Sequence, residues 1–402
     1  MKTAHENRAV VLGVTGSIAC YKAVDLASKL TQAGALVDVI LTRGAAQFVT
    51  PLTFRSITHR PVATEMFDAD SELSVEHVAL ARRADIVVVA PATAHTIAKM
   101  ALGLADDMLT TTLLATEAPV VVAPAMDANM NEHPAVRENL ETLRDRGITI
   151  VGPVAGRLAS GLWGAGRLVE PVELMGHIAA VLGRKGDLAG RTVVVSAGGT
   201  AEPIDPVRVI TILSSGKQGY AIAEAARDRG ATVKLVAAPT ALADPAAVEV
   251  IRTETVAQMR TAVLKACKRA DVLVMAAAVS DFRPAETAQH KVKKAKGQNG
   301  LSLRLVQNPD FLLEVPDSVI KVGFAAESED LLENARQKLT GKRLDLIAAN
   351  DITATDSGFG VDSNRVTILD SKGGTEEVPL CSKYEVGHRI LDRVAALLNG
   401  KS

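Results

Sequence analysis

Short, continuously hydrophobic segments alternate with longer, amphipathic and alanine-rich segments along most of the chain. The hydrophobic segments are rich in Val and Ile, and they fall at residues 10–14, 37–41, 86–90, 120–123, 192–196, 232–237, 272–276 and 320–324. Hydrophobic strands separated by helices are typical of parallel sheets that helices cover on both faces. The pattern therefore predicts an α/β protein with doubly wound, Rossmann-like, mainly parallel sheets.

The series of strands begins twice. The first begins with ENRAVVLGVTG at Glu6 and the second with GRTVVVSAGGT at Gly190, and in both a Gly-rich turn is followed by a helix and a GA-x-V entry into the next strand. The segment between them, VLGRKGDLAG at residues 181–190, is rich in glycine and charge. We place a boundary near Asp187, which predicts two domains, residues 1–187 and 188–402.

The C-terminal quarter departs from the alternating pattern. Residues 364–379 contain VTILD, a SKGG turn and TEEVP, which predicts an antiparallel hairpin added to the second sheet. One face of the last helix is apolar, through Val386, Ile390, Leu391, Val394, Leu397 and Leu398. This periodicity predicts a helix that covers the sheet.

Composition and charge exclude several classes of protein. The chain is 48% hydrophobic, which excludes intrinsic disorder. Its formal net charge is −1, so no overall positive charge would hold it on DNA or on an anionic membrane. Only 3% of its residues are aromatic, so base stacking on single strands is not expected. We find no secretory signal, no apolar stretch of the ~18 residues that a membrane helix needs, and no disulfide or zinc pattern among the 3 cysteines. We therefore expect a cytoplasmic protein that binds neither nucleic acid nor membrane.

The common nucleotide motifs are absent. Thr211 stands where a P-loop ending in Gly216–Lys217 needs its first glycine, and GVTG at residues 13–16 is not a dinucleotide fingerprint. Gly16 and Ser17 nevertheless precede a helix at the carboxyl end of a strand, where free N–H groups suit an anion. Ser214, Ser215 and Gly216 have the same placement in the second domain. An ordinary βα turn with a serine cap explains both patterns equally well.

Polar side chains also gather where other strands end. PATAHTIAKMALGLADDMLT follows one buried strand, and PAMDANMNEHP at residues 124–134 follows the next. Polar residues on loops at strand ends mark a binding site more often than a core. Two capped helices would also explain Asp106 and Asp107, and a lone histidine such as His77 is usually a surface or capping residue.

Lysines are concentrated in the second domain. HKVKKAKG places Lys291, Lys293, Lys294 and Lys296 in one short loop between two strand ends, MAAAVSDFRP and NPDF. A run of charge is usually only solvated, but at the mouth of a strand-end crevice it suits a polyphosphate. Lys338 and Lys342, four residues apart on one helix face, could add to this site.

These motifs together resemble a known family over nearly the whole chain, the bacterial bifunctional phosphopantothenoylcysteine decarboxylase/phosphopantothenate–cysteine ligases of coenzyme A biosynthesis. The first domain resembles the flavin-dependent cysteine decarboxylases, with a flavodoxin-like fold, through GSIACYK, TPLTFRSIT, EHVALARRADIVVVAPATA, GLADDMLT, PAMDANM and GAGRLVEP. The second resembles the CTP-dependent ligase through TAEPIDPVR, SSGKQG, AAAVSDFR, KVKK, NPD, GFAAE and LIAANDI.

The resemblance implies FMN in the first domain. Its phosphate is expected on Gly16, Ser17 and Ile18 and near Thr42, and its ring against the backbone of Ala90, Pro91, Ala92 and Thr93, with Ala105 and Asp106 nearby. A flavin held by backbone groups agrees with the low aromatic content. His77 corresponds to the family's base, which removes a proton while the flavin takes a hydride from the carbon bearing the thiol.

Two residues of the first domain depart from the family pattern. Asp127 stands where an asparagine usually holds the substrate carboxylate, so Asn129, followed by Met130, could take over that contact. Ser160 stands where the family often has a cysteine as proton donor on a flap, and a hydroxyl is a much weaker acid than a thiol.

For the second domain the resemblance implies that phosphopantothenate is activated by CTP and Mg²⁺ as an acyl cytidylate, which cysteine then attacks. CTP is expected on Ala276, Ala277, Ala278, Pro309, Asp310, Phe311, Leu312, Phe324, Lys338 and Lys342. Asp281 is expected at the metal-bound triphosphate and Lys291 at the charge that develops during transfer. The substrate side is expected at Arg208, Ser214, Ser215, Gly216 and Lys217.

A third departure lies in VRVITILSSG, where Ile212 replaces the asparagine that the family has before SSG. Isoleucine cannot donate a hydrogen bond to an acyl phosphate, so we expect a slower or differently supported second half-reaction. The resemblance also implies trimers of the flavin domain, with the active site between subunits, and dimers of the ligase domain, which together make a homo-oligomeric dodecamer. Two alternatives remain open from the sequence: only one activity is retained, or the chain is a flavin-binding regulatory protein.

Overall fold

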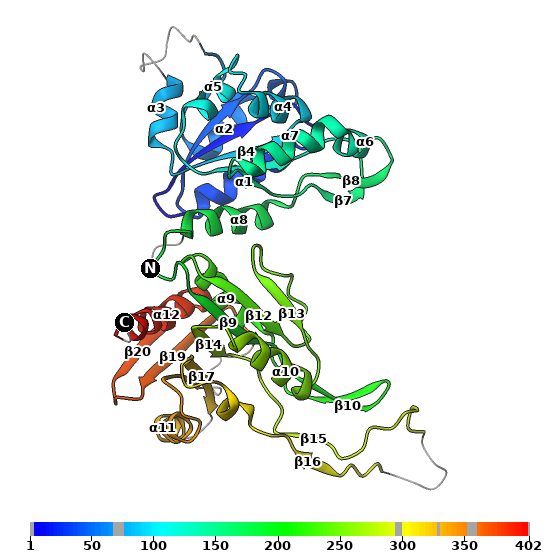
Figure 1. Ribbon diagram of the computed structural model, residues 1–402, viewed down its shortest axis with the longest axis vertical. Helices are drawn as coiled ribbons and strands as arrows, with labels where there is room; N and C mark the ends of the chain where they lie inside the picture. Colours follow the sequence, from blue (N-terminus) through cyan, green and yellow to red (C-terminus); the bar gives the residue numbers. More distant parts are fainter. Residues whose placement is uncertain (1–3, 67–75, 294–299, 328–329, 352–359, 401–402) are drawn as a thin grey trace. The chain divides into compact units, whose positions relative to one another are not determined.

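The computed structural model describes residues 4–66, 76–293, 300–327, 330–351 and 360–400. Contacts divide the chain into two compact units, Met1–Leu182 and Gly183–Ser402, and each is described by itself (Figure 1).

The first unit is built on a parallel sheet of six strands in the order β3-β2-β1-β4-β5-β6. The strands are β1 (Ala9–Val14), β2 (Leu36–Leu41), β3 (Val62–Ala63), β4 (Ile86–Ala92), β5 (Val120–Pro124) and β6 (Thr149–Ile150). The hydrophobic segments that predicted strands in this half all form strands, and the order reverses beside β1, where Val10 pairs with both Val37 and Ile86. Ligands bind at such a reversal in doubly wound sheets, outside the carboxyl ends of the strands.

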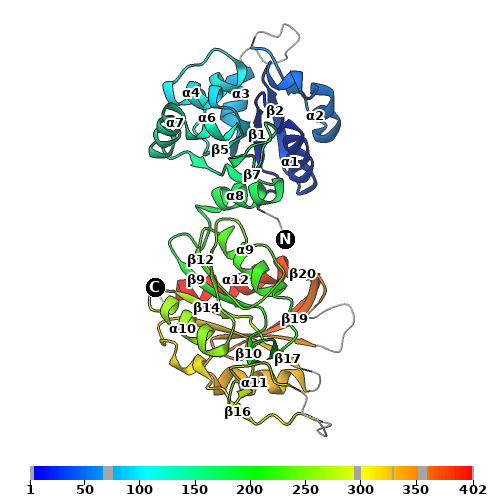
Figure 2. The same cartoon turned by 90° about the vertical axis from the view of Figure 1, so that its right-hand side faces the viewer.

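Helices cover both faces of this sheet. They are α1 (Cys20–Gln32), α2 (Pro51–Thr58), α3 (Glu76–Arg83), α4 (Ala94–Leu102), α5 (Met108–Ala115), α6 (Ala128–Glu132), α7 (Pro134–Asp145) and α8 (Pro171–Gly183), with a short 3₁₀ turn η1 (Ala45–Gln47). Val10 and Leu12 pack under α1, α2 and α8 on one face, whereas Val11 packs under α3, α4, α5 and α7 on the other. Figure 2 shows α1 and α2 on one side of the sheet and α4 and α7 on the other.

An antiparallel hairpin follows β6. Its strands are β7 (Val154–Arg157) and β8 (Trp163–Arg167), and its turn exposes Leu162 and Trp163. The hairpin lies close to α6, since a Cβ added to Gly164 would stand 2.7 Å from the Cβ of Ala128. The backbone N–H of Met126 also donates to the carbonyl of Gly166 at 3.0 Å. The hairpin turn is therefore held beside the loop that follows β5.

The second unit contains an eight-stranded sheet in the order β13-β12-β9-β14-β17-β18-β19-β20. Its strands are β9 (Thr192–Ala197), β12 (Thr232–Ala237), β13 (Glu249–Arg252), β14 (Val272–Met275), β17 (Ile320–Glu327), β18 (Leu346–Asp351), β19 (Ser363–Asp370) and β20 (Thr375–Ser382). The first six run parallel, and β19 and β20 form the predicted antiparallel hairpin at one edge.

The helices of this unit are α9 (Lys217–Arg227), α10 (Val256–Cys267), α11 (Leu331–Gly341) and α12 (Lys383–Gly400), with a 3₁₀ turn η2 (Phe311–Glu314). Val193 packs under α9 and α12, and Val194 packs under α10 and α11. As predicted, α12 buries Val386, Ile390, Leu391, Val394 and Leu398. Two antiparallel ribbons leave the sheet, one formed by β10 (Ala201–Asp205) and β11 (Arg208–Thr211), the other by β15 (Phe282–Pro284) and β16 (Leu305–Gln307).

Residues 183–187, which the sequence places in the first domain, pack on the second unit. The Arg229 guanidinium binds the Asp187 carboxylate, with Nε at 2.9 Å from Oδ1, and also Asp392. A Cβ on Gly183 would stand 2.3 Å from the backbone oxygen of Asp228, and one on Gly186 would stand 2.3 Å from that of Arg229. The glycines of this segment thus allow two stretches of backbone to touch.

Candidate functional site

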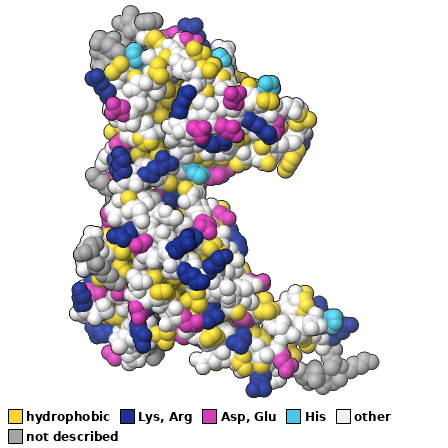
Figure 3. All heavy atoms as spheres, in the orientation of Figure 1, with side chains coloured by type: hydrophobic (Ala, Val, Ile, Leu, Met, Phe, Trp, Pro, Cys, Tyr) yellow, Lys and Arg dark blue, Asp and Glu magenta, His cyan; other side chains and the backbone are white. Residues whose placement is uncertain are grey.

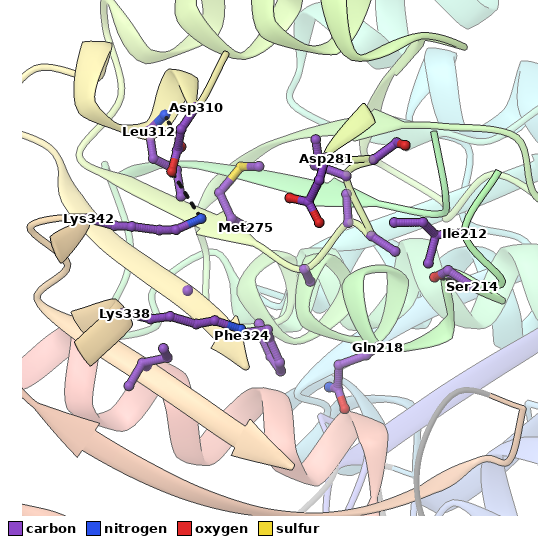
Figure 4. Close-up of a pocket in the computed structure, with 18 of the residues that line it drawn as sticks. Ile212, Ser214, Gln218, Met275, Asp281, Asp310, Leu312, Phe324, Lys338 and Lys342 are labelled. Carbon is purple, nitrogen blue, oxygen red and sulfur yellow. Dashed lines mark hydrogen bonds and ion pairs between the residues drawn. The ribbon is translucent and has the colours of Figure 1, made fainter. Parts of the chain in front are cut away.

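A cavity of about 640 Å³ opens at the carboxyl ends of the central strands of the second unit. Figure 4 shows Ile212 and Ser214 at one end, Lys338 and Lys342 at the other, and Asp281 between them. Most of the residues predicted for the ligase site line it: Ala276, Ala277, Ala278, Asp281, Pro309, Asp310, Phe311, Leu312, Phe324, Lys338, Lys342, Ser214, Ser215, Gly216 and Lys217.

One end of the cavity is the N-terminus of α9. The hydroxyls of Ser214 and Ser215 each accept a backbone N–H two residues ahead, at 3.4 Å, so the serines act as local caps. Gly216 has a φ of 76°, which favours glycine at this turn. The ammonium of Lys217 reaches the Asp362 carboxylate at 2.7 Å. The N-terminus of a helix carries partial positive charge, and together with the lysine it makes this end suitable for an anion.

The other end carries two lysines, Lys338 in the last turn of α11 and Lys342 directly after the helix. The ammonium of Lys342 lies 3.0 Å from the carboxylate of Asp310, which also accepts the backbone N–H of Leu312 at 3.2 Å. The side chain of Asp281 is exposed to the cavity. The cavity therefore has cations at both ends and a carboxylate in the middle.

Ile212 lines the same cavity and is 37% exposed. The neighbouring Thr211 hydroxyl donates to the carbonyl of Thr200 at 2.9 Å, so it is engaged within the ribbon. At this position the cavity wall is apolar.

Two predicted ligase residues lie outside the cavity lining. Lys291 is exposed in the loop before β16. Arg208 binds the Asp205 carboxylate at 2.5 Å and the carbonyl of Val292 at 3.1 Å, which ties β11 to that loop. Lys294 and Lys296 lie outside the described residues.

The sequence did not point to several polar residues of this cavity, among them Gln218, Asn350, Asn364 and Lys383. The Nδ2 of Asn364 donates to the Oε1 of Gln218 at 3.1 Å, and the Nε2 of Gln218 donates to the carbonyl of Lys383 at 3.0 Å. Burial and the nearby Lys217 charge lower the pKa of Lys383, the first residue of α12. Lys383 opens a helix whose first turns also carry Glu385 and His388, so the sequence pattern did not set it apart.

The first unit has its own pocket, of about 740 Å³, at the carboxyl end of β1. Gly16, Ser17, Ile18, Thr93, Asp127, Met130 and Ser160 line it. Within the described residues, the backbone N–H groups of Gly16, Ser17 and Ile18 donate to no other group of the chain. A Cβ on Gly16 would stand 2.9 Å from the backbone carbon of Gly44, so the turn that presents these N–H groups requires glycine.

The segment predicted to support the flavin ring is mostly behind the pocket wall. Ala90, Pro91 and Ala92 are buried and do not line the pocket. The buried hydroxyl of Thr15 donates to the carbonyl of Pro91 at 2.7 Å and accepts the N–H of Thr93 at 2.9 Å. Thr15 thus fixes the strand end from which Thr93 enters the pocket.

Other predicted flavin residues also lie outside the pocket lining. The Thr42 hydroxyl donates to the carbonyl of Val14 at 3.2 Å and accepts the N–H of Ala45 at 3.3 Å. Asp106, next to Ala105 before α5, pairs with Lys99 at 2.6 Å. Thr42 and Asp106 therefore bind neighbouring residues of their own unit.

Asp127 and Ser160, both departures from the family pattern, are in contact. The Ser160 hydroxyl donates to Oδ2 of Asp127 at 2.6 Å, and the backbone N–H of Asn129 donates to Oδ1 at 3.0 Å. These two hydrogen bonds lower the pKa of the Asp127 carboxyl, so it is ionised at neutral pH. The side chain of Asn129 is exposed, outside the pocket lining.

His77 lies in the first turn of α3 and is half-buried, as expected for a helix start. It does not line the pocket of its own unit. The sequence also missed the basic residues that do so, namely Lys22, Arg157 and Arg167.

The family model described as "Flavoprotein" matches residues 1–183, and the model described as "DNA/pantothenate metabolism flavoprotein C-terminal domain" matches residues 188–398. The Coenzyme A biosynthesis bifunctional protein CoaBC of Bacillus subtilis is 46% identical over 97% of this chain and 97% of its own length. The chain belongs to this family. The CoaBC proteins of Vibrio cholerae, 42% identical over 95% of this chain and 96% of theirs, and of Mycobacterium bovis, 45% identical over 98% and 97%, are further relatives.

Membership in the CoaBC family confirms the resemblance found in the sequence. It confirms the α/β fold class, with a flavoprotein domain first, and the prediction of a bifunctional enzyme of coenzyme A biosynthesis with decarboxylase and ligase domains. Among the helices of the described residues, none has the length and hydropathy needed to cross a bilayer.

Proposed function

We propose that this enzyme joins 4′-phosphopantothenate to cysteine with CTP and then decarboxylates the product to 4′-phosphopantetheine with FMN. We assign the ligase to residues 188–402 and the decarboxylase to residues 1–187. The observation that carries the proposal is that the predicted ligase residues, far apart in sequence, meet in one cavity with cations at both ends. Family membership supports the pairing of the two activities.

The cavity of the second unit suits CTP and Mg²⁺. The Asp281 carboxylate makes no ion pair within the described residues, so it is available to a cation. No cluster of three or more acidic, histidine or cysteine ligands occurs in the part of the chain that the structure describes. Mg²⁺ that arrives with a nucleotide needs only one or two carboxylates, because phosphates and water complete its shell. Asp281 is thus the residue that would hold it.

The ligase reaction has two transfers. A carboxylate oxygen of phosphopantothenate attacks the α-phosphorus of CTP, and the bond to pyrophosphate breaks. The amine of cysteine then attacks the acyl carbon, loses a proton and displaces CMP. Lys338 and Lys342 hold the nucleotide at one end, and Ser214–Lys217 hold the pantothenate side at the other. Ile212 offers no hydrogen bond to the acyl group between them.

The pocket of the first unit suits FMN. The unpaired N–H groups of Gly16, Ser17 and Ile18 at the start of α1 match the oxygens of a phosphate. When bound, FMN supplies a hydride acceptor for the carbon that bears the substrate thiol. Thr15 fixes the backbone at Pro91 and Thr93, and Thr93 and the Asp127–Ser160 pair line the same pocket.

A second copy of the chain completes both sites in this proposal. His77 and Lys291 are absent from the pockets of their own units, which supports their acting on a neighbouring subunit. The two ribbons of the second unit, which lie side by side at β10 and β15, expose large apolar side chains: Val207, Val209, Leu213, Phe282 and Leu305. Figure 3 shows hydrophobic side chains among charged ones where these ribbons extend from the second unit, at the lower right of the view. Such patches favour association.

One experiment tests both activities. The purified full-length chain is supplied with phosphopantothenate, cysteine, CTP and Mg²⁺, and products are followed by mass. We expect phosphopantetheine, CO₂, CMP and pyrophosphate, with flavin absorbance in the preparation. Absence of pyrophosphate release would mean that the attack on CTP fails. Accumulation of the acyl cytidylate would mean that the attack by cysteine fails, and accumulation of phosphopantothenoylcysteine would mean that decarboxylation fails. A protein that binds no FMN on reconstitution would exclude the decarboxylase.

A further inference from the structure

The pocket of the first unit contains a fixed negative charge. Both carboxylate oxygens of Asp127 accept hydrogen bonds, Oδ2 from the Ser160 hydroxyl at 2.6 Å and Oδ1 from the N–H of Asn129 at 3.0 Å. The hydroxyl of Ser160 therefore donates its proton to Asp127. The two residues, 33 positions apart in sequence, thus form a pair that ties the hairpin turn to the start of α6.

A negative wall is unfavourable for an anionic ligand, and three basic residues line the same pocket. Lys22 is buried and engaged, since its ammonium donates to the carbonyl of Leu168 at 2.8 Å and to Glu170 at 2.7 Å. Arg167 faces the same glutamate at 3.7 Å. Its guanidinium also lies across Gly156, whose added Cβ would stand 2.8 Å from Nη1.

Arg157 is the remaining basic residue. Its exposed side chain makes no hydrogen bond or ion pair with any other residue that the structure describes. Arg157 is the last residue of β7, pairs with Trp163 in the hairpin register, and precedes Ser160 by three positions. It therefore presents an uncommitted guanidinium in the pocket that Asp127 and Ser160 also line.

The substrate class then decides what this guanidinium binds, and this step rests on the proposed function. The reacting end of an N-acylcysteine carries a carboxylate, and that end must enter the flavin pocket, whereas the phosphate lies at the far end of the pantothenoyl arm. A guanidinium binds a carboxylate through two parallel hydrogen bonds. We propose that Arg157 binds the substrate carboxylate in this chain, in place of residue 127, whose negative charge is already paired with Ser160.

The test uses two non-reactive ligands that differ only in the carboxylate. Phosphopantothenoylserine carries it, and phosphopantothenoylethanolamine lacks it, and neither has a thiol to oxidise. Each is titrated into the FMN-loaded full-length protein, and the Kd is read from the shift of the flavin absorbance, which reports on the first unit alone. The variants are Arg157→Gln, Arg157→Lys and the control Arg144→Gln, an exposed arginine in the last turn of α7.

We expect Arg157→Gln to raise the Kd of the serine ligand about 10- to 100-fold, the range for hydrogen bonds to a charged group, and to leave the ethanolamine ligand within about twofold. Arg157→Lys should restore part of the affinity, and Arg144→Gln should change neither ligand. Asp127→Asn should tighten the serine ligand, because it removes the repulsion.

Equal loss for both ligands would mean that Arg157 contacts the phosphate or shapes the pocket, and unchanged affinity for both would mean that it contacts neither; either result overturns the proposal. The proposed function fails separately, if the wild-type protein retains no FMN or releases no CO₂ from phosphopantothenoylcysteine. Retention of FMN by Arg157→Gln at the wild-type ratio confirms that the variant pocket is folded.

Discussion

Gly219 in the first turn of α9 controls how closely that helix approaches the sheet. A Cβ at this position would stand 2.6 Å from the Cβ of Ala197 and 2.7 Å from the backbone oxygen of Ser196, both in β9. Neither neighbour is the end of a flexible side chain, so Gly219→Ala must displace the helix. The same helix start carries Ser214–Lys217 into the ligase cavity.

The size of the effect follows from these distances. Ordinary carbon contacts lie at about 3.5–4.0 Å, so the start of α9 must move by roughly 1 Å. Overpacking of this kind costs about 1–3 kcal/mol, and the better helix propensity of alanine offsets about 1 kcal/mol of it. We expect a net loss of up to about 2 kcal/mol, which lowers the Tm of a unit of this size by up to about 8 °C.

The assay is calorimetry of the full-length protein with and without CTP and Mg²⁺. Unfolding of two units need not be a single transition. If the second unit binds CTP as proposed, its transition is the one that shifts upward with the nucleotide. The single tryptophan, Trp163, lies in the first unit, so its fluorescence does not report on α9. The KM for phosphopantothenate is measured in parallel and should rise, since the groups that we propose bind it move with the helix.

Gly341→Ala is the matched control. Gly341 also lies in a helix, at the end of α11, and nothing stands within 4 Å of an added Cβ. It should leave the Tm unchanged or raise it slightly, because alanine favours the helix. If Gly219→Ala melts at or above the temperature of Gly341→Ala and keeps the wild-type KM, the argument from close packing is wrong.

Three further predictions concern the second unit. Ile212→Asn restores an amide to the cavity wall and should raise the rate of cysteine ligation at saturating CTP; an unchanged rate would refute a role for this position. Lys342→Met should raise the KM for CTP about tenfold or more through the loss of a charged contact, with the KM for cysteine as the internal control. Burial opposes ionisation of Asp370, but N–H donors, including that of Gly374, and the Arg393 charge hold its pKa below the ordinary value. That stabilisation is present at neutral pH and is lost as pH falls through the lowered pKa, so the Tm deficit of Asp370→Asn should shrink from pH 7 to pH 3; a constant deficit would contradict it.

The sequence determined the secondary structure of the sheets and their division into two units. Hydrophobic runs of four to six residues, such as 10–14 and 192–196, became buried central strands because their apolar side chains favour burial on both faces of the sheet, while the neighbouring strands pair their backbone groups. The final hairpin and α12 followed from local turn chemistry and a helical period. Contacts in the structure group Gly183 and Gly186 with the second unit, because they touch the backbone of Asp228 and Arg229, a contact that local pattern does not encode.

The sequence also determined most of the chemistry. The ordered motifs identified a decarboxylase and a ligase, and most residues proposed for the nucleotide meet in one cavity. The prediction could not extend to Lys383 or Gln218, since their place in that cavity depends on how α12 and α9 pack together. The sequence of a helix does not show which residues of other elements will face one of its buried polar side chains.

Only the tertiary structure decided which side chains act on one another. Asp127 and Ser160 read as two separate departures in the sequence, whereas the hairpin brings them to 2.6 Å and makes them one hydrogen-bonded pair. The same fold leaves Arg157 uncommitted in the pocket that they line and keeps His77 out of the pocket of its own unit. Hydrophobic periodicity is local and can be read along the chain, but charge pairing depends on distance in space, and the packing of the elements sets that distance.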